Sequence, residues 1–272
     1  MRRCTSTYHP SPVSHAPSLT RFQVPDKLPA NPAIIVGIHW CSGNAAAYYA
    51  GTNFAQKAES LGYIVIYPSV TTSDGCWDVS SPATLTHLGG GDSLAIHSMV
   101  QYTAAKYNAD KTRIFAVGTS SGAMMTNVLL GAYPDVFAAG SSWAGVPFGC
   151  FAGPTTWSSD CADGLIDKTP AQWGDAVRAA YPGYTGKRPK MQMFHGTDDD
   201  VLAYENFGEG VEQWTNVLGI SATPDSTEVG KPQSGMTRMV YGGGKLEAVI
   251  EHGLGHNLVV LPDEGMRISA GF

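Results

Sequence analysis

Short apolar runs recur along the chain and are separated by polar or amphipathic stretches. The runs at residues 33–40, 63–69 and 113–118 consist mainly of Val, Ile, Ala and aromatic residues. Runs of about four to eight such residues are typical of strands that are buried on both faces. Three more strands are predicted at residues 137–145, 190–196 and 245–253.

Segments of helical periodicity lie between these runs. Residues 92–108 begin with Asp92, a good N-cap residue, and their apolar residues then recur at helical spacing. Other helices are predicted at residues 54–62, 121–134, 171–183 and 211–219. This alternation predicts an α/β fold in which a mostly parallel sheet is covered by helices on both faces. In such sheets, functional sites lie at the C-terminal ends of the strands.

The chain divides into a short tail and one domain. Residues 1–20 are rich in Ser, Thr, Pro and His, and we expect them to form a disordered tail. Residues 21–272 contain neither an internal repeat nor a linker, so we expect them to form a single domain. A chain of this length can bury a sizeable core.

Charge and hydropathy argue against two classes of partner. The formal net charge is -6, and there is no basic cluster beyond Arg2 and Arg3. We therefore expect no nucleic-acid partner. No apolar run approaches the roughly 20 residues that span a membrane, so no membrane association is expected.

The first 20 residues also lack the apolar segment of a signal peptide.

A G-x-S-x-G motif lies at the junction between a predicted strand and a predicted helix. It consists of Gly118, Ser120, Gly122 and the two residues between them. A strand that turns sharply into a helix forces the middle residue into a strained conformation, and the glycines remove side chains that would clash. The motif therefore predicts that Ser120 is a nucleophile, although a chance match in a Gly-rich loop is the alternative.

A serine nucleophile needs a histidine base and an orienting carboxylate, which should follow it in the order Asp or Glu, then His. Three successive aspartates, at positions 198 to 200, follow the predicted strand 190–196. Only one of them can face the histidine, and the spacing does not choose between them. His256, in a Gly-rich loop, is a better candidate for the base than His252, which ends a strand. His39 and His195 also end strands, and we interpret both as orienting residues with structural hydrogen bonds.

The mechanism also needs backbone donors for an oxyanion. One should be the amide of Ser121, which follows the nucleophile, and the other should lie in the loop after an early strand. Cys41 or a neighbour in the loop 38–44 would supply it. No metal or organic cofactor is expected for this chemistry.

Five cysteines are present, and none forms a C-x-x-C pair or a zinc-ligand pattern with histidines. Four of them, Cys41, Cys76, Cys150 and Cys161, fall in the domain. Two disulfides or four buried free thiols are both compatible with the sequence. Cys4 would be left over in the tail.

Taken together, these motifs resemble a known family. The stretches that carry the resemblance are "IHWCSG", "YIVIYPS", "GCWDVSSPATLTHLGGGDS", "GTSSGAMMTNV", "YPDVFAAGSSWAGVPFGCF", "TPAQWGDAVRAAYPGYTGKRPKMQMFHG" and "GLGHN". The chain is similar to the fungal acetylxylan and feruloyl esterases of carbohydrate esterase family one, within the poly(3-hydroxybutyrate)-depolymerase-like esterases. The resemblance covers nearly the whole domain and implies an α/β-hydrolase fold.

The resemblance implies a role for each candidate residue. It places the nucleophile at Ser120 and the base at His256, and its H-G-x-x-D pattern selects Asp199 from the three aspartates. It implies an oxyanion donor at Cys41 beside that of Ser121. It also implies secretion, and with it the disulfides Cys41–Cys76 and Cys150–Cys161.

The resemblance implies that the substrate is an acylated plant cell-wall polysaccharide such as xylan. We expect the protein to be a monomer. Trp40 and Trp143 stand where many relatives have tyrosine, and we expect both near the mouth of the site, where they would fill space around the acyl group. This favours acetyl over feruloyl esters. Feruloyl esterase, polyester depolymerase and non-catalytic carbohydrate-binding protein are the alternatives. Loop aromatics that could stack on sugars are Trp40, Trp77, Trp157 and Tyr241.

Overall fold

A computed structural model describes residues 20–270 of the chain. Its strands are β1 (Arg21–Gln23), β2 (Ile34–Ile38), β3 (Ile64–Tyr67), β4 (Ile114–Thr119), β5 (Ala139–Trp143), β6 (Lys190–Gly196), β7 (Ser226–Val229), β8 (Met236–Tyr241) and β9 (Leu246–Glu251). They form a nine-stranded sheet in the order β1-β3-β2-β4-β5-β6-β9-β8-β7. Strands β3, β2, β4, β5, β6 and β9 are parallel, whereas β1, β8 and β7 pair antiparallel at the two edges.

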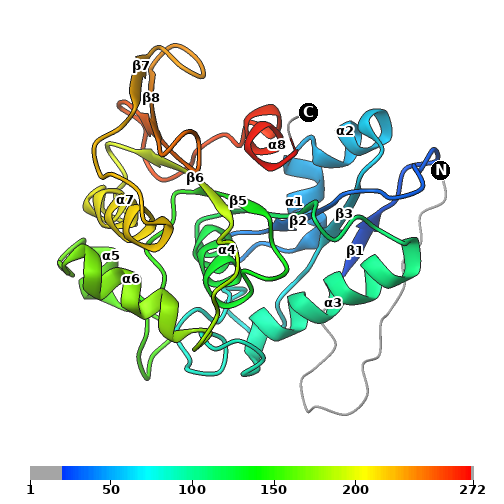
Figure 1. The fold of residues 1–272 in the computed structure, drawn as a ribbon, viewed down its shortest axis with the longest axis horizontal. Helices are drawn as coiled ribbons and strands as arrows, with labels where there is room; N and C mark the ends of the chain where they lie inside the picture. Colours follow the sequence, from blue (N-terminus) through cyan, green and yellow to red (C-terminus); the bar gives the residue numbers. More distant parts are fainter. Residues whose placement is uncertain (1–19, 271–272) are drawn as a thin grey trace.

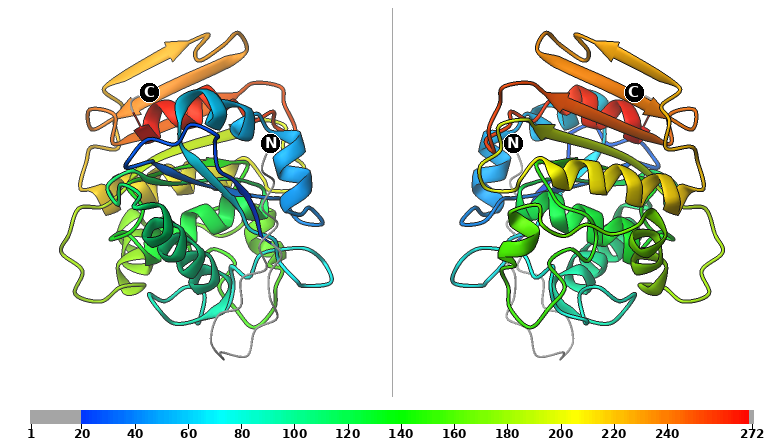
Figure 2. Two further views of the ribbon diagram at one scale, coloured as in Figure 1. Left: turned by 90° about the vertical axis from the view of Figure 1, so that its right-hand side faces the viewer. Right: turned by 90° about the vertical axis from the view of Figure 1, so that its left-hand side faces the viewer.

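Helices cover both faces of the sheet, as Figures 1 and 2 show. They are α1 (Ala45–Gly51), α2 (Phe54–Leu61), α3 (Gly91–Tyr107), α4 (Ser121–Ala132), α5 (Ser159–Ala162), α6 (Pro170–Ala179), α7 (Glu205–Leu218) and α8 (Pro262–Ala270). Helices α3, α4, α6 and α7 pack on one face, and α1, α2 and α8 on the other. The predicted mostly parallel sheet with helices on both sides is therefore confirmed.

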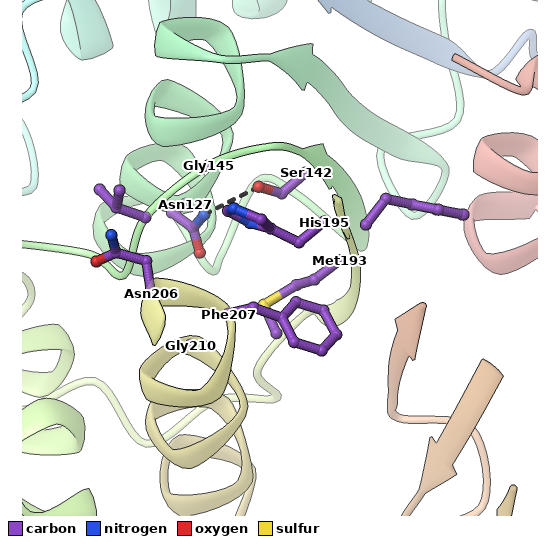
Figure 3. Close-up of a pocket in the computed structure, with 10 residues that line it drawn as sticks. Asn127, Ser142, Gly145, Met193, His195, Asn206, Phe207 and Gly210 are labelled. Atoms are coloured by element: carbon purple, nitrogen blue, oxygen red, sulfur yellow. Dashed lines mark hydrogen bonds between the residues drawn. The ribbon is translucent and has the colours of Figure 1, made fainter. Parts of the chain in front are cut away.

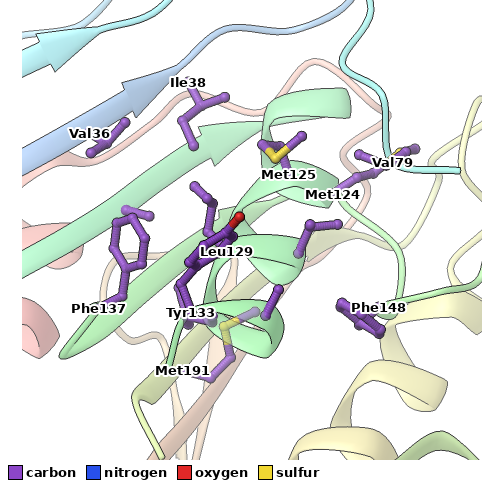
Figure 4. Close-up of a cluster of buried hydrophobic side chains, with 14 of the residues drawn as sticks. Val36, Ile38, Val79, Met124, Met125, Leu129, Tyr133, Phe137, Phe148 and Met191 are labelled. Carbon is purple, nitrogen blue, oxygen red and sulfur yellow. The ribbon is translucent and has the colours of Figure 1, made fainter. Parts of the chain in front are cut away.

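Alternation along the strands divides the core into two layers. Ile34, Val36 and Ile38 of β2 pack with the larger helical layer, whereas Ile35 faces α1 and α2. Figure 4 shows the larger cluster, in which Met125 and Leu129 of α4 point toward the sheet. Every residue of α4 is buried, which explains why this segment has no polar face. The helix that follows the candidate nucleophile is thus firmly held by the core.

Some predicted boundaries differ from the structure. Helix α3 takes Gly90 as its N-cap, and the Asp92 carboxylate instead accepts a hydrogen bond from the Asp78 amide at 2.8 Å. Helix α7 begins at Glu205, six residues before the predicted start. The prediction missed these residues because the first part of the helix lacks the periodic apolar residues of its second half. The hairpin of β7 and β8 was not predicted, since β7 is largely exposed and has no apolar run.

The predicted tail at residues 1–20 and Cys4 lie almost wholly outside the described residues, which begin at position 20. Within residues 20–270, no helix is both long enough and apolar enough to cross a membrane. Strand β1 begins one residue after this start and pairs with β3 along Arg21, Phe22 and Gln23.

Candidate active site

Ser120 occupies a sharp turn between β4 and α4. Its φ of 56° and ψ of -121° are unusual for a residue with a side chain, so the turn is strained. The flanking glycines make it possible. A Cβ on Gly118 would lie 2.1 Å from the Gly122 carbonyl oxygen, and a Cβ on Gly122 would lie 2.2 Å from that of Ile38. The Ser120 amide donates to the Trp143 carbonyl at 2.9 Å, which ties the turn to the end of β5.

Three side chains from distant parts of the sequence form one hydrogen-bonded chain at the C-terminal ends of the strands. His256 Nε2 lies 2.8 Å from Ser120 Oγ. His256 Nδ1 lies 2.8 Å from Asp199 Oδ2 and 3.0 Å from Oδ1. Since a carboxylate only accepts, Nδ1 carries the proton and Nε2 is left to accept from the serine. This tautomer is the one that a general base requires.

Asp199 is held ionised by its surroundings. Burial acts to raise its pKa, but hydrogen bonds from His195 and His256 and from the Leu202 amide outweigh burial and hold the pKa well below its ordinary value. The Val201 and Leu202 amides donate to Oδ1 at 3.0 and 2.9 Å. The carboxylate is therefore a fixed negative partner for the imidazole of His256.

The competing candidates are occupied elsewhere. Asp198 accepts a hydrogen bond from Thr197, and Asp200 is exposed. His252 Nε2 lies 2.9 Å from the hydroxyl of Thr237. The structure therefore brings together Ser120, Asp199 and His256, and none of the other candidates for the same roles.

The two remaining strand-end histidines are buried and make structural hydrogen bonds. His195 Nε2 donates to the Leu202 carbonyl at 2.8 Å and lies 3.2 Å from Asp199 Oδ2. His39 Nδ1 donates to the Trp40 carbonyl at 2.7 Å, and burial lowers the pKa of His39 despite this bond. Both arrangements agree with the orienting roles expected from the sequence.

The candidate oxyanion loop, residues 38–44, lies against the start of α4. The position that a Cβ on Gly122 would take is only 2.6 Å from the His39 carbonyl oxygen, so loop and helix are in direct contact. Ser121 is the first residue of α4, where amides have no partner within the helix. Among the residues that the structure describes, the Cys41 amide has no acceptor in the chain either. Both amides are thus available to an oxyanion.

The segment 72–77 holds this loop in place. Cys76 forms a disulfide with Cys41, and the indole of Trp77 donates to the His39 carbonyl at 2.8 Å. The Ser42 amide donates to the Asp74 carbonyl at 3.0 Å. Trp77 was not predicted to have this role. In the sequence, this role was indicated only by the position of Trp77 directly after Cys76, because a disulfide from Cys76 to Cys41 also brings the neighbouring residue close to the loop.

The second disulfide joins Cys150 to Cys161 and closes the connection between β5 and α5. Asn206 Nδ2 donates to the Cys161 carbonyl at 2.8 Å, so this disulfide is anchored to α7. It is therefore separate from the oxyanion loop and provides a matched control for the first disulfide.

Removing the first disulfide should impair catalysis more than removing the second. We expect Cys41→Ser/Cys76→Ser to lower kcat by about tenfold with little change in KM, because the candidate oxyanion donor at Cys41 would lose its fixed position. Cys150→Ser/Cys161→Ser should leave kcat within about twofold. Each pair should lower the free energy of unfolding by about 3–4 kcal/mol. Steady-state kinetics and denaturant titration would measure both effects, and equal losses of kcat in the two variants would contradict this role.

The expected place of Trp143 is wrong. Its side chain is 0% exposed, stacks on Phe194 with ring centroids 3.5 Å apart and donates from its indole to Ser141. It points into the core because it continues the alternation of β5, and only its carbonyl serves the site. Trp40 is partly buried and packs against Tyr48, at the candidate oxyanion loop.

The other aromatics that were predicted to lie in loops also differ in exposure, and Tyr241 is the last residue of β8. Trp77 and Tyr241 are buried, at 5% and 4% exposed, so neither presents a face to a sugar. Trp157 is 47% exposed and stands edge-on to Phe151. Of this group, only Trp157 and the partly buried Trp40 retain a surface on which a sugar could stack.

A small internal pocket lies between α4, the ends of β5 and β6, and α7, as Figure 3 shows. Its lining includes Asn127, Ser142, His195 and Asn206, but neither Ser120 nor His256. The pocket therefore lies behind the carboxylate side of the site and is not where an ester would meet the serine. Across residues 20–270, no group of three His, Cys, Asp or Glu side chains is placed to hold a metal ion.

Comparisons with known proteins agree with this geometry. Residues 22–236 match the model of the family described as Esterase PHB depolymerase. Acetylxylan esterase A of Aspergillus oryzae is 48% identical over 249 residues, which cover 90% of this chain and 81% of that protein. Feruloyl esterase B of Talaromyces stipitatus is 46% identical over 239 residues, 86% of this chain and 66% of that protein.

Solved structures agree as well. Acetyl xylan esterase from Aspergillus awamori superposes with a TM-score of 0.89 at 42% identity, covering 92% of this chain and 93% of that one. Esterase PE8, at 14% identity and a TM-score of 0.56, shares the fold alone; it covers 93% of this chain and 97% of that one. With the family model spanning most of the domain, the chain belongs to the Esterase PHB depolymerase family and is a carboxylic ester hydrolase.

Proposed function

We propose that this protein is a serine acetylxylan esterase that uses Ser120, His256 and Asp199 as its catalytic triad. The hydrogen-bonded chain from Ser120 through His256 to Asp199 is the observation that carries the proposal. The acetylxylan esterase names of relatives at 44–48% identity, including three different Aspergillus species and Emericella nidulans, support the substrate.

The geometry supports a two-step acyl transfer. Ser120 Oγ attacks the ester carbonyl carbon while His256 Nε2 takes the hydroxyl proton, and the amides of Ser121 and Cys41 stabilise the negative oxygen. The tetrahedral intermediate collapses, the bond between the carbonyl carbon and the sugar oxygen breaks, and His256 gives the proton to that leaving oxygen, which departs as the sugar alcohol. Water, activated by the same histidine, then attacks the acyl-serine and releases the acid. The ionised Asp199 stabilises the imidazolium that forms in each step.

The structure gives a weaker argument than the sequence for an acetyl rather than a feruloyl substrate. Trp143 is buried against Phe194, so of the two tryptophans expected to fill space around the acyl group only Trp40 lies at the oxyanion loop with a partly exposed side chain. Feruloyl esterase is the second candidate, because a relative of that name is 46% identical to this chain. In an apolar acyl pocket, small changes in size alter discrimination by only about 10–200-fold, so the two activities are close neighbours.

The two disulfides support an extracellular place of action. Disulfides persist in oxidising compartments and are rare in the reducing cytosol. A secreted enzyme would meet its polymeric substrate directly. The net charge of -6 is compatible with a neutral polysaccharide ester and disfavours a strongly anionic one.

A paired assay tests the proposal. The protein would be given acetylated xylan and methyl ferulate, and released acetate and ferulate would be quantified. We expect kcat/KM for acetate release to exceed that for ferulate by about tenfold or more. Dominant ferulate release would keep the mechanism and replace the substrate. Labelling by an organophosphate, located on Ser120 by peptide mass analysis, separates an active esterase from a non-catalytic binding protein, which would not label.

A further inference from the structure

Glu251, the last residue of β9, has a buried carboxyl group that the proposed mechanism does not use. Its side chain is 1% exposed, and Oε1 has no hydrogen-bond partner among the residues that the structure describes. Buried polar atoms almost always have a partner, and a buried carboxylate without one is much more costly than a buried carboxylic acid. The group is therefore better accommodated as a carboxylic acid whose O–H has an acceptor close by.

The register of the sheet identifies what surrounds this carboxyl. Glu251 pairs with Gly196 of β6 and Met236 of β8, so its side chain leaves the sheet on the same face as theirs. A Cβ on Gly196 would lie 2.1 Å from the Leu254 carbonyl oxygen and 2.8 Å from that of Gly255. Two backbone acceptors of the segment 252–256 thus lie over this face, beside the Glu251 side chain.

That segment carries His256 and is tied to the loop that carries Asp199. The Asp198 amide donates to the Leu254 carbonyl at 2.9 Å, and the Thr197 amide donates to the Glu251 carbonyl at 3.1 Å. A displacement of residues 252–256 would therefore move His256 relative to both Asp199 and Ser120. Backbone hydrogen bonds at and beside Glu251 therefore join the loop that carries Asp199 to the segment that carries His256.

Resting on the proposed function, we propose that Glu251 is a positioning residue that works as a neutral carboxylic acid. Its O–H donates to the backbone carbonyls of the His256 segment and holds the imidazole against Ser120. When the proton leaves to solvent, the carboxylate faces carbonyl oxygens in an apolar setting, the segment moves away, and turnover falls. Glu251 thereby sets the alkaline limit of activity.

Burial supports this protonation state, since it raises the pKa of Glu251 to about 7. The charged groups nearby are paired elsewhere. On the same face of the sheet, Arg238 binds Glu228 and Glu264, and Glu247 binds Arg267. His252 bonds to Thr237, Asp198 to Thr197, and Asp199 and His256 to each other.

The sign of the effect follows from the direction of this shift. A carboxyl whose folded-state pKa lies above its ordinary value favours the folded arrangement at low pH. This contribution is lost as the pH rises through about 7. The wild-type enzyme should therefore weaken on the alkaline side, where an ordinary serine hydrolase with a neutral histidine base would stay active.

The experiment compares kcat for acetate release by wild type, Glu251→Gln and Glu251→Leu between about pH 6 and about pH 8.5. We expect wild-type kcat to fall by about threefold or more over this range and the Gln variant, whose amide donates at every pH, to hold its value. The Leu variant, with no donor, should have a lower kcat throughout with little change in KM. Glu247→Gln, on the same strand and face, is the matched control and should follow the wild-type profile.

An alkaline limb that is the same in wild type and Glu251→Gln, or no limb in the wild type, would overturn the proposal. If the variants do not fold, infrared spectroscopy of the wild type still decides, because the proposal requires a protonated carboxyl band near pH 6.5 that disappears toward about pH 8.5. The proposed function fails in a different way: wild type would release neither acid and Ser120 would not label at any pH.

Discussion

Replacing Ser120 by alanine is expected to lower kcat by roughly 10⁴- to 10⁶-fold while the protein stays folded. The side chain is the only nucleophile in the hydrogen-bonded chain with His256 and Asp199. Residual turnover would come from substrate binding and the oxyanion donors, because they do not depend on the hydroxyl. Alanine removes that hydroxyl without adding atoms to the tight turn, so we expect the backbone to keep its conformation. The interaction lost is the hydrogen bond between Ser120 Oγ and His256 Nε2.

Acetate release from acetylated xylan, measured alongside thermal unfolding, would test this expectation. Ser60→Ala is the matched control, since Ser60 is an exposed residue of α2 whose hydroxyl donates to the Lys57 carbonyl. We expect the control to keep kcat within about twofold. If Ser120→Ala retained a tenth or more of the wild-type kcat, another nucleophile would have to be sought.

Replacing Gly122 by alanine is expected to remove nearly all activity and to destabilise the fold. The new Cβ would lie 2.2 Å from the Ile38 carbonyl oxygen and 2.6 Å from that of His39, and both are backbone atoms that cannot rotate away. Either β2 and the oxyanion loop must shift or α4 must move off the sheet, and every residue of α4 is buried. Overpacking of this kind costs about 3 kcal/mol or more when backbone must move.

Gly208→Ala is the matched control for this substitution. Gly208 lies on the exposed side of α7, and a Cβ there would meet nothing within 4 Å. Because alanine is the better helix former, the control should raise the free energy of unfolding by up to about 1 kcal/mol. Calorimetry should therefore show melting temperatures that move in opposite directions, by about 2–4 °C per kcal/mol. Equal melting temperatures for Gly122→Ala and wild type would contradict the proposed contact.

Much of the fold followed from the sequence because it depends on local patterns. The segment that became β6, residues 190–196, has the predicted bounds, since a short stretch with Met191, Met193 and Phe194 between two turns is typical of a strand. The hairpin of β7 and β8 did not follow, because β7 is held by pairing with β8 and not by its own hydrophobicity. Asp92 failed as an N-cap for a similar reason: Asp78, from another segment, bonds to its carboxylate.

The candidate site divides in the same way. The G-x-S-x-G motif predicted Ser120 as the nucleophile, and chain order together with family resemblance predicted Asp199 and His256 as its partners. Spacing along the chain did not choose among the three aspartates, because only the folded turn decides which carboxylate faces the imidazole. The side-chain direction of Trp143 was mispredicted for the same reason, since it depends on which face of β5 the residue takes.

The sequence by itself determined the alternating α/β order, the sharp turn at Ser120 and the identity of the family, because each depends on residue types at short or recognisable spacing. Only the tertiary structure decided which groups meet. It aligned Ser120 with a histidine 136 residues away, tied the Cys41 loop to Trp77, and buried Glu251 beside the carbonyls of the His256 segment. Those contacts depend on the register and packing of strands that are distant in the chain, and residue order alone does not encode their geometry.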